Sequence, residues 1–95
     1  MGKMLKGIKA IADENRLKII KLLLRKNYCV RALAEKLDIS ESAVSQQLKI
    51  LRKAGLVVGE KKGYFVHYMV KTDNLQRIGD YLVKLGENKN EVSSS

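Results

Sequence analysis

The stretch that most constrains the fold is SESAVSQQLKILRKAG, residues 40–55, whose apolar residues recur at helical spacing. Its apolar face consists of Ala43, Val44, Leu48, Leu51 and Ala54. Ser40 is a favourable N-cap, because its hydroxyl can accept a hydrogen bond from a free amide at the helix start. Gly55 can take the left-handed conformation that ends many helices. The stretch therefore predicts one helix, about residues 40–54, with a single buried face.

The other face of this predicted helix carries hydroxyls, amides and cations, with Glu41 as its one acid. Its members are Ser42, Ser45, Gln46, Lys49, Arg52 and Lys53. Hydroxyls and amides can hydrogen-bond to base edges, and cations suit phosphates. The face therefore predicts a helix that enters the major groove of DNA. An ordinary solvated helix face is the alternative.

The charge balance points to a polyanionic partner. Nineteen Lys and Arg stand against ten Asp and Glu, which gives a net charge of +9. This surplus favours nucleic acid before an anionic membrane. Residues 1–30 hold eight basic and two acidic residues, whereas residues 64–95 hold four of each. A basic N-terminal part and a neutral C-terminal part predict a DNA-facing surface followed by a segment that has a different role.

The remaining composition limits size and location. Ninety-five residues make one small domain, which a dimer interface would help to stabilise. The longest apolar runs are too short to cross a bilayer, and the first residues lack the apolar core of a signal peptide. One cysteine excludes an intrachain disulfide and fits a reducing compartment.

Three further helices are predicted before residue 40. They cover about residues 4–12, 14–26 and 30–37. Asp13 is placed to cap the second helix. The expected core face of this helix is Leu17, Ile20, Leu23 and Leu24, and Ile19 and Leu22 widen it. Residues 38–40 are short enough to be a turn, with Ile39 as an apolar plug. A short helix, a turn and a helix with a polar outer face predict a helix-turn-helix.

A β-hairpin is expected after Gly55. Residues 56–58 predict a first strand, residues 61–63 a turn, and YFVHYMV, residues 64–70, a second strand. Beside a helix-turn-helix such a hairpin is a wing. Lys61 and Lys62 could then reach the sugar-phosphate backbone or the minor groove. Alternatively, the two lysines only keep a strand edge soluble.

The last predicted helix covers about residues 74–85, with Thr72 or Asp73 as its cap. Its apolar stripe contains Leu75, Ile78, Leu82 and Leu85. The first and last helices are both amphipathic, so they predict a two-fold dimer interface, unless they only cover the core of their own chain. The folded domain is expected over residues 1–86, and the polar tail, residues 87–95, is expected to be disordered.

Taken together, the elements predict a mainly α fold with a small β-hairpin, in the order α-α-α-α-β-β-α. Two segments, IADENRLKIIKLLL and VRALAEKLDISESAVSQQLKILRKAGLV, resemble the ArsR/SmtB family of winged helix-turn-helix repressors. The resemblance covers about residues 4–85. It implies a cytoplasmic homodimer that binds double-stranded DNA at a palindromic operator and represses transcription.

The resemblance also implies which residues contact DNA. The expected groove contacts are Ser42, Ser45, Gln46, Gln47 and Lys49, and Arg52, Lys61 and Lys62 are expected to hold phosphates. Ser40, at the start of the same helix, completes the predicted set. Gln47 stands where the family often has histidine, and Tyr64 stands where its wing often has arginine. These departures predict an operator unlike that of common relatives.

The sequence predicts neither a bound metal nor another cofactor. Where metal-sensing relatives often carry Cys-Val-Cys, this chain has Cys29, Val30 and Arg31. Soft metals need several thiolates, and the arginine adds a repelling charge. The last helix contains no histidine, so a mixed carboxylate and imidazole zinc site lacks its nitrogen donors. His67, the only histidine, lies on the second wing strand.

Other functions fit the sequence less well. An enzyme is not expected, because the chain has no nucleophile and base in a common context and no phosphate-binding loop. A protein-interaction or RNA-binding module without operator reading is the main alternative, and it predicts large apolar residues on the outer face of helix 40–54. A redox response through the Cys29 thiol is a third hypothesis. Loss of DNA binding on mild peroxide that persists in Cys29→Ser would contradict it.

Overall fold

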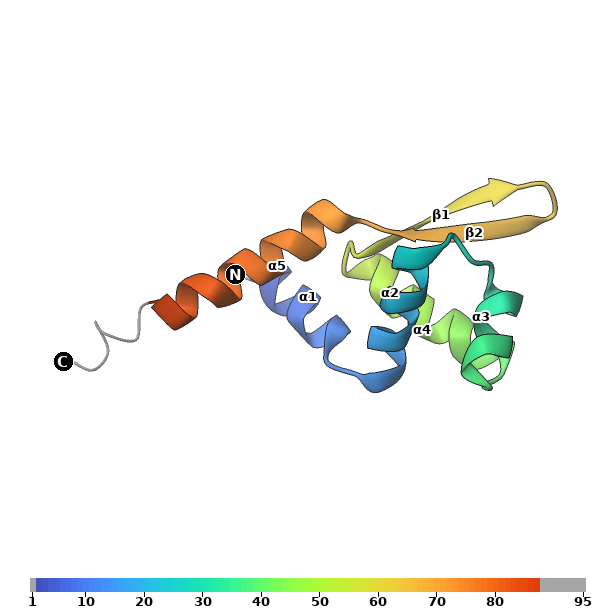
Figure 1. Cartoon of the computed structure of the whole chain (residues 1–95), viewed down its shortest axis with the longest axis horizontal. Helices are drawn as coiled ribbons and strands as arrows, with labels where there is room; N and C mark the ends of the chain where they lie inside the picture. Colours follow the sequence, from blue (N-terminus) through green and yellow to red (C-terminus); the bar gives the residue numbers. More distant parts are fainter. Residues whose placement is uncertain (1, 88–95) are drawn as a thin grey trace.

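The computed structural model describes residues 2–87, which form five helices and one two-stranded antiparallel hairpin (Figure 1). The helices are α1 (Gly2–Ile11), α2 (Glu14–Arg25), α3 (Val30–Leu37), α4 (Glu41–Lys53) and α5 (Thr72–Glu87). The strands are β1 (Val57–Lys62) and β2 (Phe65–Val70). The predicted fold class and element order are confirmed. In this part of the chain, no helix combines the length and apolarity needed to cross a membrane.

The core gathers around the inner face of α4. Val44, Leu48 and Leu51 are at most 1% exposed, as the helical spacing of residues 40–55 predicts. They join buried residues from every other helix and from the start of the hairpin. The remaining buried apolar members are Ala10, Ile19, Ile20, Leu23, Leu33, Ala34, Leu56, Val57 and Ile78. The core occupies the inner side of α4, so only the outer side of this helix is available to a partner.

The buried face of α2 differs from the predicted one. Ile19, Ile20 and Leu23 are buried, whereas Leu17 and Leu24 are 43% and 52% exposed. The prediction that Leu17 and Leu24 belong to the core is therefore wrong for the single chain. Two overlapping apolar stripes both satisfy the helical period. The packing of α2 against α1, α3, α4 and β2 selects the stripe that contains Ile19.

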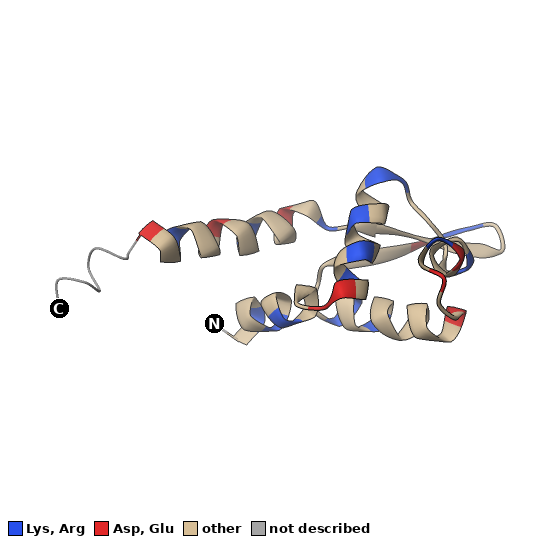
Figure 2. Ribbon diagram, turned by 60° about the horizontal axis from the view of Figure 1, so that its bottom comes forward, with Lys and Arg blue, Asp and Glu red and all other residues tan. Residues whose placement is uncertain are grey.

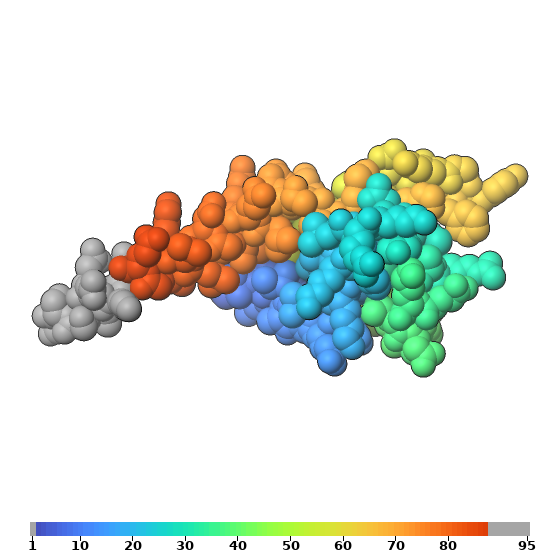
Figure 3. Space-filling view, viewed as in Figure 1, coloured from blue at the N-terminus to red at the C-terminus, as the bar shows by residue number. Residues whose placement is uncertain are grey.

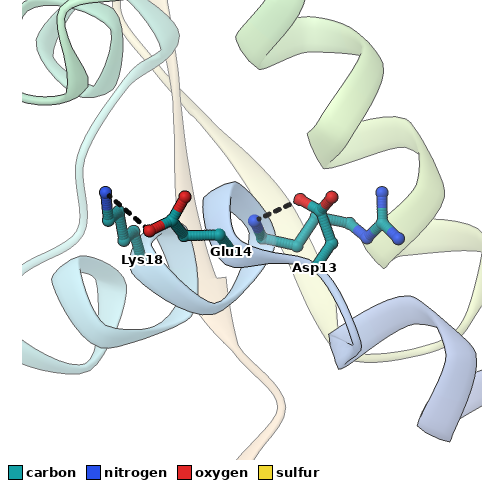
Figure 4. A network of polar contacts seen from close by, with 4 residues as sticks. Asp13, Glu14 and Lys18 are labelled. Carbon is teal, nitrogen blue, oxygen red and sulfur yellow. Dashed lines mark hydrogen bonds and ion pairs between the residues drawn. The ribbon is translucent and has the colours of Figure 1, made fainter.

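Two N-caps fix the starts of α2 and α4 as predicted. A side-chain oxygen of Asp13 accepts a hydrogen bond from the Arg16 amide at 3.1 Å (Figure 4). In the same first turn, Glu14 lies 3.7 Å from the ammonium of Lys18, and both side chains are exposed. The Ser40 hydroxyl accepts from the Ala43 amide at 3.0 Å. Such a cap contributes about 1 kcal/mol.

The helix-turn-helix consists of α3, a tight turn and α4. Asp38 ends α3 in the left-handed region with φ 55°, a conformation that Asp tolerates better than most residues. Ile39 follows as a partly buried residue packed against the core, which confirms its predicted role as an apolar plug. After α4, Gly55 turns the chain with φ +74°, and its carbonyl accepts from Asn74 Nδ2 at 2.7 Å. This bond joins the end of α4 to the start of α5.

The hairpin turn begins two residues later and ends one residue later than predicted. Lys61 and Lys62 are the last residues of β1 and pair with Val66 and Phe65, so they do not form the turn. The turn consists of Gly63, with φ +65°, and Tyr64, which is fully exposed. Leu56 is buried just before β1 rather than forming its first residue. Pairing the lysines within a strand fixes their backbone more firmly than a loop would.

The segment between α2 and α3 pairs with β2 through a single β-bridge. Cys29 forms an isolated antiparallel bridge with His67, and the Tyr68 amide donates to the Tyr28 carbonyl at 3.0 Å. The sequence showed this segment only as a break between helices. These contacts hold the wing against the body of the domain (Figure 1).

The terminal helices pack together and leave apolar side chains exposed. Contact with the core comes from Gly7 and Ala10 of α1 and from Ile78 of α5. A Cβ on Gly7 would lie 2.8 Å from Ile78 Cδ1, so the absence of a side chain permits the close approach. The far half of α5 projects beyond the body (Figure 3). Its exposed large apolar residues are Leu82, Val83 and Leu85, and Leu5 is exposed on α1.

The boundaries of the terminal helices differ from the predicted ones. α1 begins at Gly2, two residues before the predicted start, and ends at Ile11. α5 begins at Thr72, so Thr72 and Asp73 lie inside its first turn and neither stands before the helix as a cap. The amides of Asn74 and Leu75 bond to the Lys71 carbonyl instead. Glu87, assigned to the tail, is helical, and residues 88–95 of that predicted tail lie outside the described residues.

Candidate nucleic-acid interface

The outer face of α4 is polar except for Ile50, which is 42% exposed and lies between Gln46 and Lys53. Ser42, Ser45, Gln46, Lys49, Arg52 and Lys53 are all exposed, as is the capping Ser40. Gln46, Lys49 and Lys53 lie at spacings of three and four residues, opposite the buried Leu48 and Leu51. Glu41 lies at the N-terminal end, where its charge suits the helix dipole, so the rest of the face is free of acids. This face can donate to and accept from base edges and can hold phosphates.

Gln47 occupies a different environment from its neighbours. Its side chain is half-buried, and its Oε1 accepts a hydrogen bond from Arg16 Nη1 at 2.8 Å. Arg16 also donates through Nε to the Ala10 carbonyl and through Nη2 to the Lys9 carbonyl at 3.5 Å. Arg16 therefore links the end of α1 to the middle of α4. The amide of Gln47 is shared between this link and any contact with DNA.

Arg16 was not among the predicted functional residues. In the sequence it stands in the first turn of a helix, where an arginine has no distinguishing neighbour. Only the fold brings it to Gln47, 31 residues later in the chain. An arginine with several donors in a fixed planar arrangement can hold three acceptors at once. Its hydrogen bonds tie the middle of α4 to the end of α1.

The wing presents its two lysines at the tip of the hairpin. Lys61 and Lys62 are exposed and consecutive on β1, so their side chains point to opposite faces of the strand. Glu60 precedes them and is also exposed. Figure 2 shows the basic segments of α1, α4 and the wing. Because the directions of their side chains alternate, at most one of the two lysines points to any given face of the hairpin.

The structure brings Cys29 and His67 opposite each other across their bridge. Residues directly opposite in an antiparallel pair have neighbouring side chains. Cys29 is half-buried and is not in a disulfide. Among residues 2–87, no three His, Cys, Asp or Glu side chains converge as a metal-binding group would require. The redox hypothesis for Cys29 stays a prediction.

A helix-turn-helix with a polar outer face, followed by a basic hairpin, defines the class of winged helix-turn-helix domains. The family model described as the bacterial regulatory protein, arsR family, matches residues 13–58. The matched region runs from the cap of α2 to the start of β1. The chain belongs to the ArsR family of transcriptional regulators. This is a family of regulators and not of enzymes.

The similar proteins include a repressor and an activator. The chain is 39% identical to the transcriptional repressor SmtB homolog of Synechocystis sp. over 73% of its own length. It spans only 52% of that relative. It is 36% identical to the transcriptional activator HlyU of Vibrio cholerae, covering 82% of this chain and 72% of HlyU.

The fold also matches a solved structure described as homodimeric. This structure is the winged helix-turn-helix DNA-binding domain Mb0332 from Mycobacterium bovis, a possible ArsR-family regulator. The TM-score is 0.76 at 25% identity, covering 90% of this chain and 81% of that domain. The resemblance therefore extends beyond residues 13–58 to the hairpin and the terminal helices.

Proposed function

We propose that the protein is a sequence-specific DNA-binding repressor that acts as a homodimer on a palindromic operator. The outer face of α4 lies in the major groove, and the wing contacts the backbone or the minor groove. The observation that carries this proposal is the two-sided α4, with a fully buried inner face and an exposed outer face of hydroxyls, amides and cations in which Ile50 is the one large apolar residue. Such a regulator works in the cytoplasm with the chromosome.

Dimerisation is supported by the exposed apolar side chains of the terminal helices. Leu5, Leu82, Val83 and Leu85 are 46–59% exposed in the single chain. Apolar side chains gathered at one end of a small domain mark an interaction site. The similar Mb0332 domain is described as homodimeric. A two-fold dimer would present two α4 helices about 34 Å apart, one turn of DNA, to the two halves of a palindrome.

Repression is favoured over activation by the similarity to the SmtB homolog, which is described as a transcriptional repressor. A dimer seated across a promoter would block access to it. A reporter gene placed behind the selected operator should be expressed less in the presence of the wild-type protein. Expression that rises instead would make the protein an activator, as HlyU is described.

Replacing Gln46 with alanine should reduce discrimination between base pairs. An amide that makes two hydrogen bonds to one base contributes about 1–3 kcal/mol of specificity. The test compares the affinity of wild type and Gln46→Ala for a duplex that the wild type selects from a random pool, and for single-base variants of that duplex. The variant should lose the penalty at one or two positions and keep it elsewhere.

Lys62→Ala should instead lower affinity without changing discrimination between base pairs. A lysine that holds a phosphate contributes to binding of every sequence, so affinity should fall for all duplexes alike. The slope of log affinity against log salt should fall in magnitude by about 0.9 for each phosphate that the variant no longer binds. Gln76→Ala, an exposed amide on α5, is the matched control and should change neither quantity. If Gln46→Ala and Lys62→Ala both behave like this control, the assignment of the DNA-binding face is wrong.

A further inference from the structure

A shallow hollow of about 310 Å³ lies between α1 and the C-terminal half of α4. Four of the residues that line it are cations: Lys6, Lys9, Arg16 and Lys53. The others are two alanines and Ile50, so the lining contains no acid. Positive charges held close together repel one another until an anion lies between them. The wall of the hollow is mainly apolar, so the case for an anion rests on the exposed side chains of Lys6, Lys9 and Lys53 around it.

The hollow continues the polar face of α4. Lys53 belongs to both, because it follows Gln46 and Lys49 on the same side of the helix. Lys6 and Lys9 are one turn apart on α1 and extend the row of cations beyond the end of α4. Figure 2 shows the basic segments of α1 and α4 on neighbouring stretches of the molecule. An anion that reaches Lys53 along the polar face of α4 can thus continue to α1.

α1 contributes two lysines to this hollow and, through Leu5, one exposed apolar side chain to the proposed dimer interface. In a helix with 3.6 residues per turn, Lys6 lies about 100° from Leu5 and about 160° from Ile8, whereas Lys9, four residues after Leu5, lies on the same side as Leu5. Lys6 and Lys9 line the hollow. Leu5 is 46% exposed and is available to a partner chain. Burial of Leu5 against a second copy would therefore leave Lys6 open and bring the partner chain next to Lys9.

The hydrogen bonds of Arg16 fix the end of α1 relative to α4. Its bonds to the carbonyls of Lys9 and Ala10 hold the end of α1, and its bond to Gln47 holds α4. The backbone that carries Lys9 is therefore fixed relative to the recognition face. Cations held in place in this way lose less conformational freedom when an anion binds.

We propose that Lys6, Lys9 and Lys53 bind backbone phosphates of DNA next to the half-site that α4 contacts. This inference rests on the proposed DNA-binding function and extends the contact surface to α1. A small-molecule site would bury most of its ligand in a concave, mostly enclosed cavity. The hollow is open to solvent and joined to the face of α4, which suits a strand of phosphates lying across it. No base is read here, so the contacts are independent of sequence.

The test measures the salt dependence of binding for Lys6→Ala/Lys9→Ala. The probe is a duplex of random sequence of about three helical turns, or roughly 30 base pairs. Fluorescence anisotropy over a range of salt gives the slope of log affinity against log salt. Its magnitude should fall by about 0.9 for each phosphate that the double variant no longer binds. The loss of affinity should be the same for the duplex that wild type selects, and Lys6→Arg/Lys9→Arg should restore the slope.

The matched control is Lys18→Ala/Lys21→Ala, which removes two exposed lysines at the same spacing on α2. If the slope for Lys6→Ala/Lys9→Ala is as steep as the slope for this control, the inference is overturned. Millimolar decanoate that binds wild type but not Lys6→Ala/Lys9→Ala, with the slope unchanged, would make the hollow a small-anion site instead. The proposed function fails separately, if wild type binds its selected duplex no more tightly than random DNA. Circular dichroism shows whether each variant folds.

Discussion

Leu82→Glu should produce a folded monomer whose affinity for a two-half-site operator is lower by about 100-fold or more. Leu82 is 47% exposed on α5 and lies outside the core of its own chain, so the fold should tolerate the change. A glutamate in an apolar dimer interface would instead be buried without a partner, which is costly. Without the dimer, each half-site is bound independently, and the gain from joining two contacts in one molecule disappears.

Sedimentation equilibrium and anisotropy on the selected duplex measure the two effects together. Lys84→Gln is the matched control, because it lies on the opposite side of α5 and also lowers the net charge by one. It should remain dimeric with near wild-type affinity. A Leu82→Glu protein that stays dimeric would show that this part of α5 is not the interface. A monomer that keeps full operator affinity would show that dimerisation is not needed for binding.

Leu51→Ala should lower the free energy of unfolding by about 3 kcal/mol. Leu51 is fully buried and belongs to the inner face of α4. Its removal leaves a cavity between α4 and the rest of the core, where neighbouring side chains relax only in part. In a domain of this size, such a loss is a large fraction of a total of about 5–15 kcal/mol. Each kcal/mol corresponds to roughly 4–8 °C in the melting temperature.

Urea denaturation at one fixed protein concentration is the measurement, because the stability of a dimer depends on concentration. The adjacent residue supplies the control. Ile50 is 42% exposed, so Ile50→Ala should cost less than about 1 kcal/mol. The contrast between neighbouring positions tests whether α4 is oriented as described. Equal losses at residues 50 and 51 would mean that a different side of α4 faces the core.

The face of α4 was accessible from sequence because its causes are local. Ser40, Gly55 and the spacing of Val44, Leu48 and Leu51 fix where the helix begins, where it ends and which side is buried. Once the apolar side is assigned, the polar side follows from the period. The predicted exposure of Ser42, Gln46 and Lys49 is confirmed for this reason. Their contacts with bases stay a prediction.

Other features depended on which elements meet. In α2, two apolar stripes have the same period. Packing against the neighbouring elements buries Ile19 and leaves Leu17 and Leu24 exposed. In the wing, cross-strand pairing put Lys61 and Lys62 in β1 and moved the turn to Gly63 and Tyr64. No local pattern distinguishes these outcomes, because burial and register are set by partners distant in the sequence.

The sequence by itself determined the order of helices and strands, the inner and outer faces of α4, and the family. These follow from propensity, capping and apolar period, which act within a few residues. Only the tertiary structure decided that Arg16 joins the end of α1 to Gln47, and that the lysines of α1 meet Lys53 at one hollow. The reason is that these groups come from separate helices, and only packing of the shared core sets the distance between them.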